Sequence, residues 1–234
     1  MNVIFNYEPI LTPLLSFCAF IIAITVHECA HAYVADRLGD PTARIMGRLT
    51  LNPLPHIDII GTIILPILLS LTGTGFVIGW AKPVQFDPFN LRHPRRDSAI
   101  ISLAGALSNF LLAILCAIAI RLLLNLNFAM LSNPTAAASV DFLVKSLLLP
   151  LTILNTSLGV FNLVPIHPLD GFKVVEGILP EEYAGQWHQL EPYGFIFLLF
   201  LIFPIFGGIP ILNRLIFPVV NTILSILLPG WRAT

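Results

Sequence analysis

Charged residues are scarce in this chain of 234 residues. Asp, Glu, Lys and Arg together make up 11% of it, against about 25% in a typical soluble domain, while 56% of the residues are hydrophobic. A globule of this size has too much surface for its volume to bury that much apolar side chain. Lipid can take up the excess, so the composition predicts an integral membrane protein and excludes a disordered or collagen-like chain.

Cysteine and net charge are low as well. The three cysteines all lie in apolar stretches, their number is odd, and no CxxC pair occurs. The sequence therefore predicts neither a disulfide framework nor a thiolate zinc site. The net charge is −1, which gives no basic surplus, so no nucleic-acid partner is expected.

Long uncharged runs predict the membrane-spanning helices, because a helix needs about 20 apolar residues to cross a bilayer. The runs cover residues 10–26 (continuing as helix to about 36), 59–71, 98–120, 146–164, 193–206 and 209–228. We expect an all-α polytopic membrane protein with about five to six transmembrane helices. It should form a single domain over residues 1–234, with a core at 10–192 and a C-terminal helical hairpin at 193–229.

Lysine and arginine orient these runs, since cytoplasmic loops carry an excess of both. Basic residues gather in 37–56 and 82–97, whereas only Arg121 and Lys145 flank the 122–144 connection. We therefore expect the first two regions, and the polar segment 170–192, in the cytoplasm, and 122–144 outside. Both ends of 57–81 then lie on the same side. The sequence predicts a re-entrant or short β-like segment there, between the first helix and the central core helix.

The motif with the clearest chemistry is His27-Glu28-Cys29-Ala30-His31, an HExxH at the end of the first apolar run. Residues four apart share a face of a helix, so both imidazoles can reach one metal ion, and Glu28 lies beside it as a general base. Imidazole ligands favour zinc. Ionisable groups in a membrane helix are costly and usually functional.

A third metal ligand has to come from elsewhere in the chain. The next glutamate after Glu28 is Glu176, and the extended HExxHxxGxxH motif is absent. Six residues compete: His56, Asp58, His93, His167, Asp170 and His188. Asp170 is the strongest candidate, because Pro165 and Pro168 unwind the helix before it and let a carboxylate turn into the bundle. His167, three residues earlier, stays open as a partner of the site, a rival ligand or a loop residue.

These motifs together resemble the site-2 proteases, a family of intramembrane zinc metalloproteases. The likeness is carried by HECAH in a membrane helix, by NLVPIHPLDG more than 100 residues later, and by Gly105-Ala-Leu-Ser-Asn109 in the span between them. GWAKPV and LEPYGF are similar to the small bacterial branch that lacks a PDZ domain. Two departures, Ala106 where the family often has Pro and His167 where small or apolar residues are commoner, remove no catalytic group.

The resemblance implies one zinc ion per chain, held by His27, His31 and Asp170, and a metal-activated water with Glu28 as the base. Asn162 and Asn109 would bind the substrate backbone or the developing oxyanion. The substrate would be a transmembrane segment of another membrane protein, and part of 49–81 would offer it an edge strand. The chain would then be a metalloprotease domain in the cell membrane, in contact with the lipid bilayer and with its active site toward the cytoplasm.

Two other classes of protein remain open at this stage. A divalent-metal transporter could use the same histidines and aspartate as a transit site, although no internal repeat is visible. A catalytically inactive scaffold of the same fold could bind helices without cutting them. The intact Glu28 argues against both, because neither needs a base beside the first histidine.

Overall fold

The computed structural model describes residues 8–71, 79–129, 134–203, 210–228 and 230–231. In this part of the chain every regular element is a helix. The β-like form of the predicted 57–81 segment is therefore not seen where that segment is described, and residues 72–78 fall outside the description. The re-entrant path itself stays a prediction.

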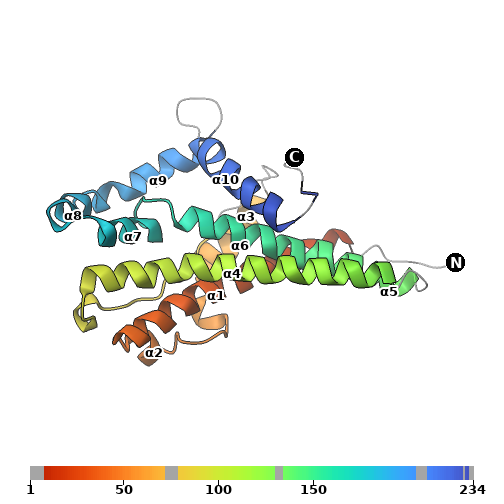
Figure 1. Ribbon diagram of the computed structural model, residues 1–234, viewed down its shortest axis with the longest axis horizontal. Helices are drawn as coiled ribbons and strands as arrows, with labels where there is room; N and C mark the ends of the chain where they lie inside the picture. Colours follow the sequence, from red (N-terminus) through yellow and green to blue (C-terminus); the bar gives the residue numbers. More distant parts are fainter. Residues whose placement is uncertain (1–7, 72–78, 130–133, 204–209, 229, 232–234) are drawn as a thin grey trace.

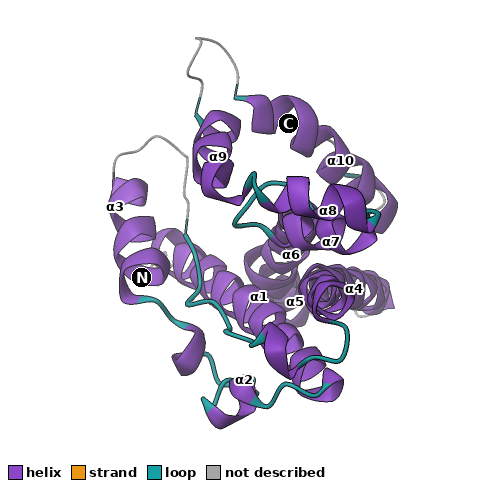
Figure 2. Cartoon of the chain, turned by 90° about the vertical axis from the view of Figure 1, so that its left-hand side faces the viewer, coloured by secondary structure: helices purple, strands orange, loops and turns teal. Residues whose placement is uncertain are grey.

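Three helices form the body of the molecule. They are α1 (Glu8–Leu38), α4 (Pro94–Ala129) and α6 (Leu149–Asn162), and α6 continues from α5 (Pro134–Leu143) through a π-helical turn, η4 (Val144–Leu148). The central helix α4 packs against both α1 and α6. Figure 1 shows α6 lying along α4 and α1 crossing it at an angle, and Figure 2 shows α4 nearly end-on.

Small residues bring these helices close together. Ala19 and Ala23 of α1 and Ala106 and Ala113 of α4 are all fully buried. In a membrane the hydrophobic effect does not drive helices together. Small side chains instead let the backbones approach closely, and the helices associate through van der Waals packing. The predicted helix through the HExxH motif is confirmed, since α1 runs past it to Leu38.

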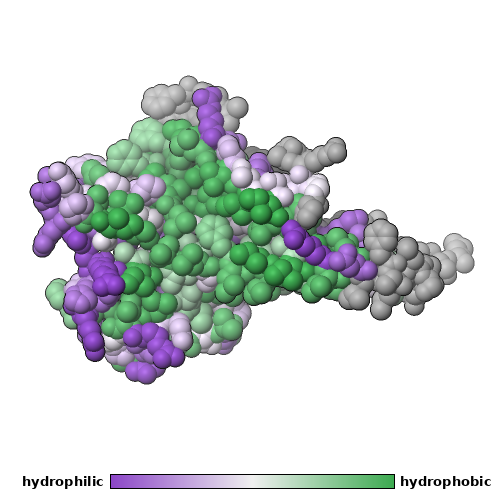
Figure 3. Space-filling model, in the orientation of Figure 1, coloured by the Kyte–Doolittle hydropathy of each residue, from purple (hydrophilic) through white to green (hydrophobic). Residues whose placement is uncertain are grey.

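Three helices are long and apolar enough to cross a membrane: 11–38, 94–125 and 135–162. Two shorter apolar helical stretches, 59–69 and 211–227, lie in the predicted second run and the last one. The structure thus supports a membrane protein with three such helices among the described residues, and the larger number of five to six stays a prediction. Figure 3 shows the apolar side chains over the middle of the molecule and polar ones concentrated at one end.

The 122–144 connection is more helical than expected. α4 continues to Ala129, beyond the predicted end near Arg121, and α5 already begins at Pro134. Arg121 can stay on an apolar helix because its guanidinium donates to the carbonyls of Ile226 and Leu227, 3.0 and 2.8 Å away, near the end of α10 (Ile211–Leu227). The charge therefore pairs with a helix terminus and does not mark the end of a span.

The remaining elements are shorter and lie around this body. α2 (Thr42–Ile45), η1 (Leu54–His56), η2 (Ile59–Ile64) and α3 (Leu65–Leu71) follow α1, and η3 (Pro88–Asn90) precedes α4. After α6 come α7 (Asp170–Ile178), α8 (Glu181–His188), η5 (Glu191–Tyr193), α9 (Gly194–Ile202) and then α10. α7 packs on α4 and carries the end of the polar NLVPIHPLDG stretch to the face of α4 that meets α1.

Candidate metal centre

The HExxH motif lies in the C-terminal half of α1, which the distribution of charges predicts to lie toward the cytoplasm. His27 and His31 are each 8% exposed and Glu28 is 9% exposed. The helix continues through all five residues, so the imidazoles four apart lie one above the other, as the pattern predicts. Their ring centroids are 4.5 Å apart.

Asp170 meets both histidines although it is more than 130 residues away in the chain. Its Oδ2 lies 3.2 Å from Nε2 of His27 and 3.3 Å from Nε2 of His31. The two Nε2 atoms are 2.9 Å apart. Within the described residues these three side chains form the one group of His, Cys, Asp or Glu ligand atoms placed to hold a metal ion.

The path to Asp170 explains its position. α6 ends at Asn162, and the segment with Pro165 and Pro168 that follows is irregular until Asp170 opens α7. At Gly171 a Cβ would overlap the carbonyl of Leu163, so α7 can start this close to the end of α6 only with glycine at that position. The carboxylate therefore turns into the helix bundle as soon as α7 begins.

Both histidines are held through their other ring nitrogen by α4. Nδ1 of His31 lies 2.8 Å from the carbonyl oxygen of Ile101, which can only accept a hydrogen bond. Nδ1 of His27 lies 2.6 Å from Oδ1 of Asn109. Each imidazole thus carries its proton on Nδ1 and turns the lone pair of Nε2 toward Asp170. Such partners fix the tautomer of metal-binding histidines.

Three acceptor atoms therefore face one another without a donor. Oδ2 of Asp170 is buried and has no hydrogen-bond partner in the described residues. A tetrahedral zinc ion separates its nitrogen and oxygen ligands by about 3.3 Å. The donor set and its spacing fit zinc.

Gly105 of α4 makes room for the two imidazoles. A Cβ at this position would overlap the ring of His31 and would lie 2.7 Å from Cε1 of His27. The histidines can approach α4, and so reach Ile101 and Asn109, because residue 105 has no side chain. The family resemblance singles out GALSN, but it does not predict this contact.

Glu28 has a partner that sequence reasoning missed. Its Oε2 accepts a hydrogen bond from the backbone amide of Val84 at 2.7 Å. The preceding residues are held by Arg48, which is 5% exposed and donates to the carbonyls of Lys82 (3.0 Å) and Pro83 (2.9 Å). No motif marks Arg48 or Val84. The burial of Arg48 cannot be read from the sequence, where it is one of several arginines in 37–56, so no signal in the sequence indicated this role.

The other candidate ligands lie elsewhere. Asp58 caps η2 by accepting from the amide of Gly61 at 2.7 Å, and His56 lies 3.0 Å from the carbonyl of Thr50. His167 and His188 both face Glu191, at 3.6 and 3.4 Å. His93 stands just before α4, and its amide donates to Asp97.

The two predicted substrate-binding amides differ in access. Asn162 is the last residue of α6 and is partly exposed at the end of the bundle. Asn109 is fully buried, and its two polar atoms are engaged within the protein, by His27 on one side and Asn155 on the other. Substrate binding by either residue stays a prediction.

The chain is similar in sequence to proteins that are named as zinc metalloproteases. The model of Peptidase family M50 matches residues 16–202. The chain is 36% identical over 213 residues to the "Putative zinc metalloprotease YwhC" of Bacillus subtilis (strain 168), covering 89% of this chain and 90% of the relative. It is 31% identical to the "Putative zinc metalloprotease Rip2" of Mycolicibacterium smegmatis, covering 88% and 71%, and 32% identical to Rip2 of Mycobacterium tuberculosis (strain H37Rv), covering 86% and 69%. No solved structure matches.

Proposed function

Because the chain belongs to peptidase family M50, a family of metalloproteases, we propose that it hydrolyses peptide bonds in or near transmembrane segments of other membrane proteins. The observation that carries the proposal is the buried centre of His27, His31 and Asp170 with Glu28 beside it. A transit site for metal or a helix-binding scaffold would need the first three residues at most. A protease also needs the base.

His27, His31 and Asp170 would hold one zinc ion. When bound, zinc polarises the scissile carbonyl and lowers the pKa of a water molecule. Three protein ligands are the number usual in catalytic zinc sites, whereas structural zinc sites have four.

Glu28 would take the proton of the attacking water and later deliver it to the leaving amine. Its Oε2 accepts a hydrogen bond from the amide of Val84, which holds the carboxylate in one orientation, and Oε1 would be the oxygen that takes the proton. Asn162, at the end of α6, would bind the backbone of the substrate or the developing oxyanion. Its partial exposure near Asp170 supports this role.

The surface of the molecule supports a substrate that lies within the membrane. Long helices with exposed Leu, Ile and Phe side chains place the centre inside an apolar body that lipid would surround. A transmembrane segment that reaches His27 has to unwind, since a helix keeps its peptide bonds hydrogen-bonded within itself. We propose that an extended substrate passes along residues 80–87, because the Val84 amide of this segment contacts Glu28.

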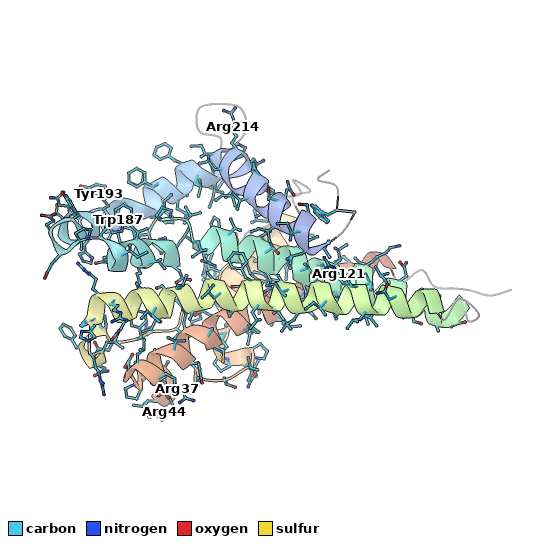
Figure 4. All side chains as sticks on the ribbon, viewed as in Figure 1. Arg37, Arg44, Arg121, Trp187, Tyr193 and Arg214 are labelled. Atoms are coloured by element: carbon cyan, nitrogen blue, oxygen red, sulfur yellow. The ribbon has the colours of Figure 1, made fainter. Side chains whose placement is uncertain are left out.

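We place the centre toward the cytoplasmic face of the cell membrane in a multi-pass chain. Arg37 and Arg44 lie at the same end of the molecule as Trp187 and Tyr193, as Figure 4 shows. Basic residues favour the cytoplasmic side and aromatic residues favour the interface. The HExxH motif lies in the half of α1 that leads to Arg37, which supports a centre on the cytoplasmic side.

Purified protein in detergent would test the proposal with a single-span membrane protein as substrate. Wild type should cut it and carry about one zinc per chain. Glu28→Gln should keep its zinc and lose cleavage by about 100- to 10,000-fold, the usual size of general-base catalysis. Glu182→Gln, an exposed glutamate of α8, is the matched control and should cut normally. If Glu28→Gln cuts as well as wild type, Glu28 is not the base. If wild type binds zinc but cuts none of several substrates, the scaffold or transport alternative is favoured.

A further inference from the structure

A chain of side-chain hydrogen bonds crosses the three main helices behind His27. Nδ1 of His27 in α1 lies 2.6 Å from Oδ1 of Asn109 in α4. Nδ2 of Asn109 donates to Oδ1 of Asn155 in α6 at 2.8 Å. Nδ2 of Asn155 donates to the backbone carbonyl of Leu151 at 2.8 Å. Both asparagines are 0% exposed, so water does not compete for these bonds.

The direction of this chain is set at its far end. The carbonyl of Leu151 can only accept, so Asn155 must turn its NH₂ group toward it and its oxygen toward Asn109. That oxygen in turn accepts from the NH₂ group of Asn109. The carbonyl of Ala23, 3.4 Å from Nδ2 of Asn109, requires the same orientation. Two backbone carbonyls thus decide which way Asn109 points.

The consequence falls on His27. With its NH₂ group taken up by acceptors, Asn109 presents its oxygen to Nδ1 of His27, which must then carry the ring proton. Nε2 is left with its lone pair, aimed at the point that His31 and Asp170 share. If Asn109 were turned over, its NH₂ group would meet Nδ1 and the proton would move to Nε2, where it would block a metal ion.

We propose that Asn109 and Asn155 are positioning residues for the metal centre, which act by fixing the tautomer and orientation of His27. The inference rests on the metal centre of the proposed function. It adds a residue of α6 to the support of that centre, although α6 supplies none of its three ligands. The proposal also assigns different kinds of support to the two histidines. His31 is fixed by the backbone carbonyl of Ile101, which no substitution removes, whereas His27 depends on two side chains.

The test measures zinc affinity of the whole protein in detergent, by competition with a chromogenic chelator. Asn109→Leu should bind zinc about 10- to 100-fold more weakly than wild type, as is usual when the partner of a metal-binding histidine is lost. Asn155→Leu should weaken zinc binding less, because it acts on His27 through Asn109. Thr156→Val is the control. It is equally buried in α6, and its hydroxyl bonds only to the carbonyl of Thr152 in the same helix, so it should bind zinc as wild type does.

A spectroscopic measurement separates this role from a purely structural one. Nitrogen NMR of metal-free, histidine-labelled protein reports which ring nitrogen carries the proton, and the His27 signal can be assigned by its loss in His27→Gln. Wild type should show His27 protonated on Nδ1, and Asn109→Leu should show the proton partly or wholly on Nε2. A wild-type His27 protonated on Nε2 would overturn the proposal even if no asparagine variant folds.

The outcomes also distinguish this inference from the proposed function. Zinc affinities of both asparagine variants equal to that of Thr156→Val would overturn the positioning role while wild type still cuts its substrate. Failure of wild type to cut any substrate, together with the expected loss of zinc affinity in the variants, would reject the proteolytic function and keep the positioning role. A wild type that binds no zinc would reject both.

Discussion

Replacement of Gly105 by alanine brings two effects of opposite sign into one position. Glycine inside a helix is less favourable than alanine by roughly 0.5–1 kcal/mol, so helix propensity alone predicts that Gly105→Ala stabilises α4. The packing predicts the reverse. A methyl group would overlap the ring of His31 and lie 2.7 Å from Cε1 of His27, where ordinary contact begins at 3.4 Å.

The size of the disturbance follows from these distances. The His27 ring would have to retreat by 3.4 − 2.7 = 0.7 Å, and the His31 ring by more. Overpacking of this kind costs typically about 1–3 kcal/mol, which exceeds the gain in helix propensity. We therefore expect a net loss of about 0–2.5 kcal/mol in the free energy of unfolding. A displacement near 1 Å in a catalytic site costs about 100-fold in rate, so cleavage should fall by about that factor.

Zinc content, cleavage rate and thermal unfolding should be measured together on Gly105→Ala in detergent. We expect less zinc, slow cleavage and an unfolding temperature at or below that of wild type. Gly185→Ala is the control, because no atom lies within 4 Å of the added methyl group, and it should gain the helix propensity without loss of activity. A Gly105→Ala protein that is more stable than wild type, with full zinc content and normal cleavage, would refute the steric reasoning.

Three further substitutions test other parts of the structure. Asp170→Asn should weaken zinc binding by more than the about 10- to 100-fold expected of an outer partner, measured by chelator competition, because a neutral amide replaces a charged ligand; unchanged affinity would remove Asp170 from the ligand set. Arg48→Met should slow cleavage about tenfold with normal zinc content, since the buried carbonyls of Lys82 and Pro83 lose their donor; the exposed Arg44→Met is its control. Asp40→Ala should lower the free energy of unfolding by about 3 kcal/mol at pH 7, because Asp40 accepts from Thr42, Asn90 and the amide of Asp87. Burial raises the pKa of Asp40, but these hydrogen bonds outweigh burial and lower the pKa below its ordinary value of about 3.9. The stabilisation is therefore complete above that ordinary value and disappears as the pH falls through the lower pKa of the folded protein. A stability difference between wild type and Asp40→Ala that persists in acid would contradict this assignment.

Local patterns in the sequence were enough for the helix that carries the motif. Spacing by four residues places His27 and His31 on one face of any helix, whatever surrounds it, and the apolar run before them requires that helix to lie in a membrane. The prolines at 165 and 168 predicted the irregular segment before Asp170, and the structure has it. These features follow from backbone geometry and solvent, which act over a few residues.

The ends of the elements were predicted less well, again for a physical reason. A charge in lipid is costly, so Arg121 predicts the end of a span. The helix continues because the carbonyls at the end of α10 accept its hydrogen bonds, and α10 lies about 100 residues further along the chain. A charge marks a boundary only when no partner comes from another segment.

The sequence by itself therefore determined that this is a membrane protein, that one helix bears two histidines and a glutamate on a metal-binding pattern, and that Asp170 leads six candidate third ligands. The tertiary structure alone decided which candidate reaches the histidines, that Gly105 leaves space for them, and that Val84 and Arg48 stand behind Glu28. It also placed Asn109 and Asn155 in line with His27. Each of these contacts joins residues that are dozens to more than a hundred positions apart, and only the packing of α1, α4, α6 and α7 against one another sets their distance and direction.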